Sequence, residues 1–259
     1  MYGSGHAEEI VGKAMKGMNL KGADRKKLFI TSKVWHNHLK YDALISSCKQ
    51  SLKRLGTDYL DLYLIHWPNP KVDINETMKA MNFLVEKGLI RHIGLSNFNV
   101  EQIKEAQDAL ARINPKSQVN ATRAFNKIFA LQIEYNLLVR NKGKYTVNME
   151  SETIPYCMKN NIQVIAWRPL ANGDLAKSGN KTVGLIANKH NKTQAQVALN
   201  WLYSKGILTV AKCSSIEHLK DNLGSLGWKL DKEDMVALDN IKEKDKLNKD
   251  VLPTPAGLK

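Results

Sequence analysis

The chain has 259 residues and three cysteines, Cys48, Cys157 and Cys213. No apolar run is long enough to span a bilayer and the first residues lack a signal-peptide pattern, so we expect a soluble, cytoplasmic protein without membrane contact. Because the cysteines are odd in number, far apart and without histidine companions, a disulfide framework and a metal site are both disfavoured. We expect no bound metal.

The formal net charge is +14. Lysines are spread along the chain among acidic residues, and no helix-turn-helix spacing or RNA-binding aromatic pattern accompanies them. The charge therefore indicates a solvated basic surface, which would also attract an anionic ligand such as a phosphorylated cofactor. We expect no nucleic-acid partner, although a nucleic-acid binder remains a hypothesis that rests on charge alone.

In chain order, a predicted helix over 6–17 comes first, and apolar strand-like runs then alternate with helical patterns. The strands are predicted at 28–33, 59–67, 91–97, 129–136, 162–167 and 207–212. The helices are predicted at 41–56, 74–89, 100–112, 152–161 and 193–206, with two more near 215–224 and 232–241. This alternation predicts a parallel sheet built of βα units.

Nearly every predicted strand ends in a polar or aromatic group that chemistry can use. A (β/α)₈ barrel gathers its active site at the carboxyl ends of its strands, whereas a doubly wound sheet concentrates such groups at one switch point. The distribution favours the barrel, with six of its eight strands visible and the missing part at the N-terminus. The strand-end residues are Lys33, His66, Ser96, Asn97, Gln132, Trp167 and Lys212.

Seven segments resemble the aldo-keto reductase family, in the family's order from Tyr2 to about Ile241. They are YGSGHAEEIVGKAM, ITSKVW, YLDLYLIHWP, GLIRHIGLSNF, LQIEYNLL, VIAWRPLANGD and VAKCSSIEHLKDNLG. The resemblance implies a (β/α)₈ barrel that reduces aldehydes and ketones with NADPH, using a tetrad of Asp, Tyr, Lys and His. We therefore expect a small-molecule carbonyl substrate, a single domain over 1–259 and, from the habit of the family, a monomer.

By this resemblance Tyr2 is the proton donor, Lys33 activates it and His66 orients the substrate carbonyl. A phenol with a pKa of about 10 is a poor acid at pH 7 until a neighbouring ammonium lowers that pKa. A neutral His66 can donate a hydrogen bond to the carbonyl oxygen as negative charge develops there.

The family's tetrad Asp precedes the Tyr by a few residues, and only Met1 precedes Tyr2 here. The first βα unit, the second strand and the Asp are therefore expected to be missing. We interpret the sequence as a fragment or a misplaced start, with a genuinely truncated protein as the alternative.

Cofactor-binding residues are also implied by the resemblance. Ser96, Asn97 and Gln132 match the groups that bind the nicotinamide carboxamide, Trp167 the stacking aromatic, and Leu170 extends that segment's pattern. The stretch VAKCSSIEHLKDN resembles the site of the adenosine 2′-phosphate, with Cys213 in place of a usual Ser. The residues implied there are Lys212, Ser214, His218, Asp221 and Asn222.

His218 stands where the family commonly has an Arg, and a histidine carries only a partial charge near pH 7. The resemblance favours NADP(H), and His218 leaves NAD(H) possible. Trp35 and Trp67 resemble the aromatic walls of the substrate pocket, although core packing would also explain them.

Two segments carry no interpretable motif. The stretch at 111–128 is longer than a barrel linker needs, and it holds SQVNAT, a rival to FALQIEYN for the same strand. We prefer FALQIEYN because it alone carries the Gln-x-Glu-Tyr-Asn pattern, and residues 243–259 are expected to form an irregular tail. The function expected from the whole is NAD(P)H-dependent carbonyl reduction. The alternative is a catalytically impaired descendant that binds nucleotide and acts as a sensor or interaction module.

Overall fold

A computed structural model describes residues 2–20, 22–113, 127–141, 147–177 and 180–243. The chain divides into two compact units, one up to Ala130 and the other from Leu131 onward. Each unit is described by itself. The expectation of one domain over 1–259 stays a prediction, and the segment 114–126, with SQVNAT, and most of the expected tail lie outside the described residues.

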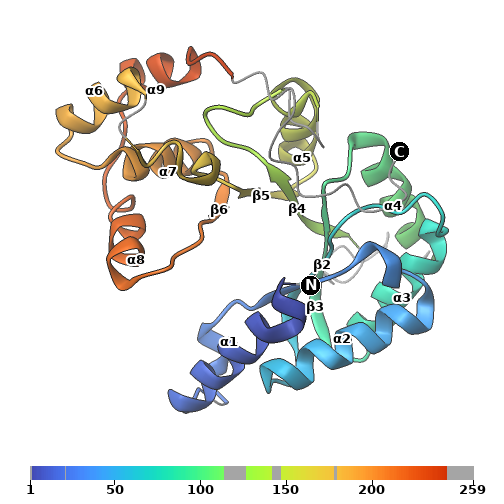
Figure 1. The fold of residues 1–259 in the computed structure, drawn as a ribbon. Coiled ribbons are helices and arrows are strands. Elements are labelled where there is room, and N and C mark those ends of the chain that lie inside the picture. Colours follow the sequence, from blue (N-terminus) through green and yellow to red (C-terminus); the bar gives the residue numbers. More distant parts are fainter. Residues whose placement is uncertain (1, 21, 114–126, 142–146, 178–179, 244–259) are drawn as a thin grey trace. The chain divides into compact units, whose positions relative to one another are not determined.

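The first unit is a series of βα units (Figure 1). Strand β1 pairs in parallel with β2, with Lys33 opposite Leu64, and β2 pairs in parallel with β3, with Ile65 opposite Leu95. Its elements are the 3₁₀ turn η1 (Tyr2–Gly5), α1 (His6–Gly17), η2 (Arg25–Lys27), β1 (Thr31–Val34), η3 (His36–His38), α2 (Tyr41–Leu55), β2 (Leu60–Ile65), α3 (Ile74–Glu86), β3 (Ile90–Ser96), α4 (Val100–Ile113) and the start of β4 (Ile128–Glu134).

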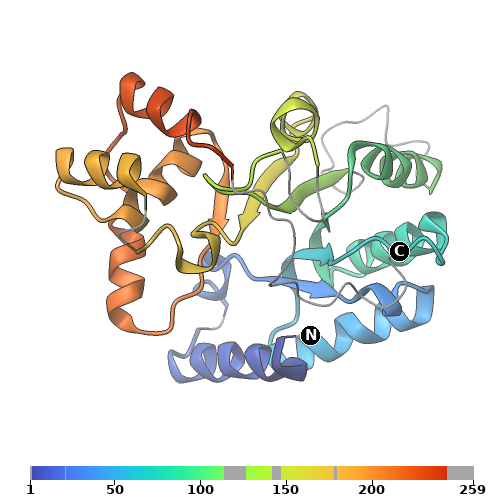
Figure 2. The ribbon, with the colours of Figure 1, turned by 45° about the horizontal axis from the view of Figure 1, so that its top comes forward.

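The core of the first unit follows from sequence pattern. All six residues of β2 are buried, as a central parallel strand covered on both faces requires. Helices α2 and α3 bury apolar side chains at helical spacing, among them Leu44, Leu52, Met78 and Met81. Helix α1 lies against α2 (Figure 2).

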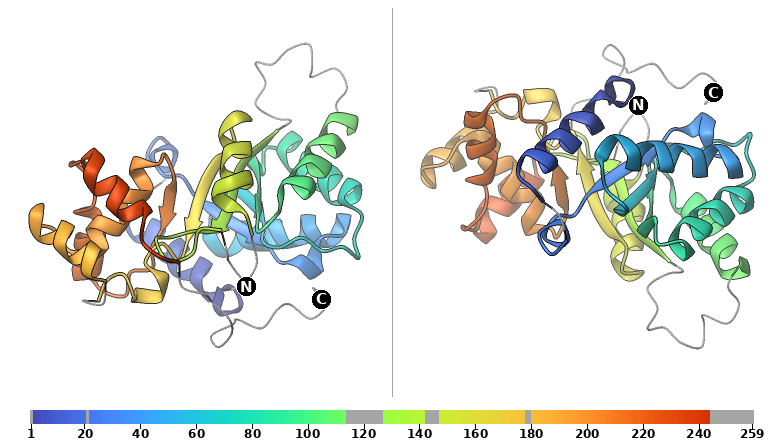
Figure 3. Two further views of the ribbon diagram at one scale, coloured as in Figure 1. Left: turned by 90° about the horizontal axis from the view of Figure 1, so that it is seen from above. Right: turned by 90° about the horizontal axis from the view of Figure 1, so that it is seen from below.

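The second unit continues the alternation of strand and helix, and β5 pairs in parallel with β6 through Trp167 and Val210. Figure 3 shows α5 beside β5, and α6 next to α9. After β4 come the π-helical turn η6 (Met149–Thr153), α5 (Ile154–Lys159), β5 (Gln163–Trp167), η7 (Ala171–Gly173), α6 (Lys181–Lys189), α7 (Gln194–Ser204), β6 (Leu208–Val210), α8 (Ile216–Leu223) and α9 (Lys232–Asp239).

All six predicted strands are present, and β4 (Ile128–Glu134) covers FALQIE of the preferred stretch FALQIEYN, so that choice is confirmed. Strand β6 is shorter than predicted, so Lys212 lies two residues beyond its end. The sequence analysis missed helix α6, whose start is fixed by the Asn180 side chain accepting a hydrogen bond from the Val183 amide. Its apolar residues form one short run, VGLIA, which shows little helical periodicity and contains Gly184.

A polar cluster fastens the amino ends of the first strands. The Asp61 carboxylate, 3% exposed, accepts hydrogen bonds at 3.0 Å from both Arg25 and Arg91 and at 2.9 Å from the Ile30 amide. The two guanidiniums lie over the Tyr59 ring, at 4.1 and 4.0 Å from its centroid. Since buried charges are costly unless paired, the cluster stabilises only as a complete set.

We expect Asp61→Ala to lower the free energy of unfolding by about 3 kcal/mol, because two guanidiniums and a buried amide lose their acceptor. Urea unfolding measures the loss. Asp58→Ala, at an exposed position nearby, is the matched control and should change stability by less than about 0.5 kcal/mol. Equal effects of the two substitutions would contradict this interpretation of the cluster.

Candidate active site

The Lys33 side chain is the central charged group of the first unit. It extends from β1, and burial lowers the pKa of its ammonium to about 8. At neutral pH the group is therefore still mostly protonated, but its proton is held less tightly than that of an exposed lysine. An ammonium of this kind can assist proton transfer from a neighbouring group.

His66 directly follows β2, the neighbour of β1 in the sheet. Burial, together with the charge of Lys33, lowers the pKa of its imidazole to about 3. The ring is therefore neutral at physiological pH and can donate one hydrogen bond without carrying charge. The Trp35 indole meets it edge-on, with 4.9 Å between ring centroids, and limits the orientation of the imidazole.

Ser96 and Asn97 lie beside His66 at the carboxyl end of β3, and both are buried. The Asn97 amide donates to the backbone oxygen of His66 and to the Ser96 hydroxyl, each at 3.0 Å. Asn97 has a left-handed φ of 62°, a conformation that asparagine tolerates better than most residues. These bonds tie the ends of β2 and β3 together.

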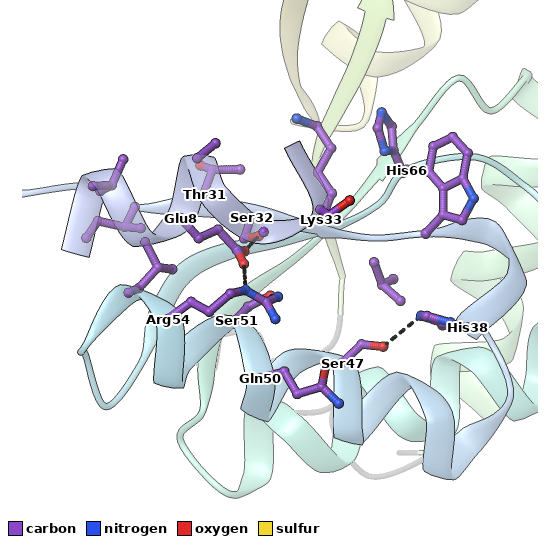
Figure 4. A pocket seen from close by; sticks show the side chains of 18 of the residues that line it. Glu8, Thr31, Ser32, Lys33, His38, Ser47, Gln50, Ser51, Arg54 and His66 are labelled. Atoms are coloured by element: carbon purple, nitrogen blue, oxygen red, sulfur yellow. Dashed lines mark hydrogen bonds and ion pairs between the residues drawn. The ribbon is translucent and has the colours of Figure 1, made fainter. Parts of the chain in front are cut away.

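Lys33, His66 and Trp35 line one cavity of about 560 Å³. Its other walls come from α1 and α2, including Glu8, Ser47 and Arg54 (Figure 4). In Figure 4, Lys33 and His66 point to one side of β1, while Glu8 and Arg54 lie on the other. The cavity thus follows β1 from a helix-facing groove to the candidate catalytic groups. Trp67, the other predicted pocket wall, is half-buried.

Tyr2 belongs to the 3₁₀ turn η1, directly before α1. Its side chain lies outside the described part of the structure, so its role as proton donor stays a prediction. The backbone here depends on glycine, because Gly3 and Gly5 both have positive φ angles, 55° and 99°.

Two of the predicted cofactor-binding residues of the second unit lie toward the carboxyl ends of strands: Gln132 in β4 and Trp167 as the last residue of β5. The Gln132 side chain is 4% exposed. Its amide offers both hydrogen-bond donors and an acceptor, which fits the amide of a nicotinamide ring. Trp167 and Leu170 are half-buried.

The residue after Trp167 is held by β4. Arg168 has a left-handed φ of 53°; its carbonyl oxygen accepts a hydrogen bond from Asn136 at 3.0 Å, and its guanidinium pairs with the buried Glu134 at 3.4 Å. The guanidinium also lies 5.1 Å from the Trp167 ring centroid. The sequence analysis quoted Arg168 only as part of a motif; its pairing with Glu134 depends on tertiary structure.

The predicted phosphate-binding residues surround the start of α8. Lys212, Ser214 and His218 are exposed, and the Ser214 hydroxyl is 3.2 Å from the His218 ring nitrogen Nδ1. Asn222 donates to the Cys213 sulfur at 3.2 Å. These groups make an exposed cationic loop whose side chains can reach an anion.

Asp221 is bound differently from its neighbours. Its carboxylate accepts from the Thr193 hydroxyl at 2.9 Å and its backbone oxygen accepts from Gln196 at 3.0 Å. Asp221 therefore joins α8 to the start of α7, so an adenine contact would have to share this carboxylate.

Within the described ranges, His190, Asp231 and Asp234 form a group whose ligand atoms lie within 4.8 Å of one another. The Lys189 ammonium already bonds both carboxylates, at 2.6 and 2.9 Å, and His190 bonds Asp234 at 2.6 Å. The Lys189 ammonium offsets one of the two negative charges, and the cluster links α6 to α9. No helix in the described ranges has the length and apolar content to cross a membrane.

The sequence analysis also missed the polar groups on the helix-facing side of β1. Glu8 accepts hydrogen bonds from Ser32 and Arg54. No local pattern announces this network, because its members are 24 and 46 residues apart. Ser32 could have been singled out only as the residue adjoining Lys33.

A buried ammonium and a neutral imidazole at adjacent strand ends of a parallel βα sheet define a site able to polarise a carbonyl group. The model of the aldo/keto reductase family matches residues 1–243. The chain belongs to the aldo-keto reductase family, and it is an oxidoreductase of the kind that reduces carbonyl groups with NAD(P)H. The parallel strands β1 to β6 of the described residues are consistent with an incomplete (β/α)₈ barrel.

Relatives and solved structures agree with this membership. The chain is 35% identical to the glyoxal reductase of Bacillus subtilis (strain 168) over 231 residues, covering 89% of this chain and 74% of that protein. It is 32% identical to the methylglyoxal reductase YeaE of Escherichia coli (strain K12), covering 92% and 76%. An aldo/keto reductase from Klebsiella pneumoniae, solved with NADP and acetate, is similar with a TM-score of 0.77 and 32% identity, covering 96% and 80%.

We expect Lys33→Met to stabilise the chain at pH 7 by on the order of 3 kcal/mol, because the buried ammonium with its lowered pKa is removed. In the unsubstituted chain the unfolded state binds more protons than the folded state between about pH 8 and 10.5, so stability rises with pH there. The advantage of the variant should therefore shrink over that range.

Urea unfolding at several pH values measures this difference. Lys49→Met, at an exposed position of α2, is the matched control and should give a difference that is small and independent of pH. A destabilised Lys33→Met variant at pH 7 would contradict the assigned burial of the ammonium.

Proposed function

We propose that the chain reduces the carbonyl group of small aldehydes and dicarbonyl compounds to an alcohol, with NADPH as hydride source. The observation that carries the proposal is the buried Lys33 ammonium, with its pKa near 8, acting on the neutral His66 beside it. The glyoxal and methylglyoxal reductases among the relatives support the choice of small dicarbonyl substrates.

In the proposed reaction, His66 donates a hydrogen bond to the carbonyl oxygen and fixes the orientation of the substrate. Its neutral state keeps it a donor without protonating the substrate prematurely. Tyr2 supplies the proton that the developing alkoxide takes up, and the ammonium of Lys33 stabilises the phenolate that remains. Trp35 and Trp67 supply apolar walls, which exclude water from the reacting carbonyl.

Bound NADPH would supply the hydride. The residues that fit it are Ser96, Asn97, Gln132, Trp167 and Leu170, of which Ser96, Asn97 and Gln132 are buried polar residues able to hydrogen-bond an amide. Lys212, Ser214 and His218 fit the 2′-phosphate as exposed donors, with Asp221 and Asn222 nearby. The solved relatives with NADP and NADPH support NADP(H) as the favoured cofactor.

The direct test is carbonyl-dependent oxidation of NADPH by the purified chain, with glyoxal and methylglyoxal as substrates. Turnover supports the proposal. Cofactor binding without turnover would instead support the nucleotide-binding descendant. The cytoplasmic location and the monomeric state remain predictions that cell fractionation and sedimentation can check.

Tyr2→Phe should lower kcat by at least about a hundredfold while leaving the Kd for NADPH within about twofold, because only the transferable proton is lost. Stopped-flow turnover and fluorescence titration with NADPH separate the two quantities. Tyr41→Phe, at the start of α2, serves as the matched control for loss of a phenolic hydroxyl. Turnover that survives Tyr2→Phe would refute the assignment of the proton donor.

The dependence of kcat on pH should be flat from about pH 5 to 7.5, because His66 with a pKa of about 3 stays neutral throughout. Above about pH 8 we expect kcat to fall as Lys33 loses its proton. A limb near pH 6.5, the ordinary histidine range, would contradict the buried, neutral state of His66.

A further inference from the structure

Glu8 of α1 connects three elements of the first unit. Its carboxylate accepts a hydrogen bond of 2.5 Å from the Ser32 hydroxyl on β1 and one of 2.7 Å from Arg54 Nε on α2. The side chains of Glu8 and Arg54 are 18% and 28% exposed, so the ion pair is largely shielded from water. Charge-assisted bonds of this length are among the stronger polar contacts in proteins.

The bond to Ser32 acts at the position that adjoins Lys33. Because side chains alternate along a strand, Ser32 faces the helices while Lys33 faces the opposite side, as Figure 4 shows. Glu8 therefore fixes α1 to the segment of β1 that carries the candidate catalytic ammonium. Burial alone would raise the pKa of the Glu8 carboxyl, yet the bonds from Ser32 and Arg54 outweigh it and lower that pKa.

Arg54 also sets how closely α1 approaches α2. A Cβ atom on Gly5 would lie 2.7 Å from Arg54 Nε, and one on Gly12 would lie 2.5 Å from the Arg54 backbone oxygen. Both glycines therefore allow α1 to lie directly on the end of α2. Gly5 is the residue that caps α1 and ends the turn that begins at Tyr2.

We propose that Glu8, through Arg54 and Ser32, is the positioning residue that places the Tyr2 segment beside Lys33 for proton transfer. The inference rests on the proposed function for its catalytic consequence. In this proposal Glu8 acts only through Ser32 and Arg54, whose side chains it binds. A misplacement of about 1 Å at a reacting group can cost up to a hundredfold in rate, so the fastening of α1 is a sensitive point.

The first experiment compares Glu8→Ala with Glu9→Ala, since Glu9 is the next residue of the same helix and bonds only the exposed His6 among the described residues. We expect Glu8→Ala to lower kcat at least tenfold, with KM and the Kd for NADPH within twofold, and Glu9→Ala to change none of them. If wild-type chain turns over and the two variants behave alike, the proposal is overturned.

Hydrogen exchange gives a readout that needs no turnover. Amides of η1 and α1 should exchange at least tenfold faster in Glu8→Ala than in Glu9→Ala, while amides of β2 and α3 stay protected and so report an intact fold. Unchanged exchange in η1 and α1 overturns the proposal even when the wild-type chain is inactive. If the wild-type chain is inactive but Glu8→Ala accelerates exchange in η1 and α1, the role of Glu8 in holding α1 is supported and only the proposed function is refuted.

Arg54→Met keeps the aliphatic stem and removes the guanidinium, which completes a double-mutant cycle. If Glu8 and Arg54 act as one device, the double variant should lose no more kcat than Glu8→Ala alone. Fully additive losses would show that Glu8 does not act through Arg54, and accelerated exchange without any loss of kcat would show a structural role only; either result overturns the proposal.

Discussion

The burial of the Lys33 ammonium is the constraint on which the site depends. Removing an ammonium from water is unfavourable, and the lowered pKa of Lys33 reflects this cost. The chain tolerates this cost because the rest of the first unit holds β1 in place. Strand β2 pairs with β1, and Asp61 accepts a hydrogen bond from the amide of Ile30, the residue before β1. Glu8 binds Ser32, the residue beside Lys33. Burial, and after it the charge of Lys33, lowers the pKa of His66 and keeps its ring neutral.

Buried polar side chains at the strand ends hold the backbone next to the candidate functional residues. Asn97 joins the ends of β2 and β3 through the His66 carbonyl, and Asn136 with Glu134 holds the residue that follows Trp167. In each case a buried side chain fixes a backbone position next to a candidate functional residue. Preorganisation of this kind lets a reacting group meet its substrate without a fresh cost of ordering.

The residues proposed to bind the cofactor differ in their burial. Ser96, Asn97 and Gln132 are buried in strand ends, whereas Lys212, Ser214 and His218 stand exposed beyond the short strand β6. The proposed nicotinamide site is therefore set by packing, whereas the proposed phosphate site consists of exposed side chains whose attraction for an anion is screened by salt. An arginine at position 218 would offer a two-pronged donor that His218 lacks.

The sequence by itself determined the alternation of strands and helices, the motif family and the strand-end position of Lys33, His66 and Gln132. These depend on periodicity and short motifs, which are local properties of the chain. Tertiary structure alone decided the lowered pKa values of Lys33 and His66, the burial of Gln132 and the partners of Glu8, Asp61 and Arg168. Burial and pairing arise between residues tens of positions apart, as Glu8 with Arg54 shows, so no local pattern can encode them.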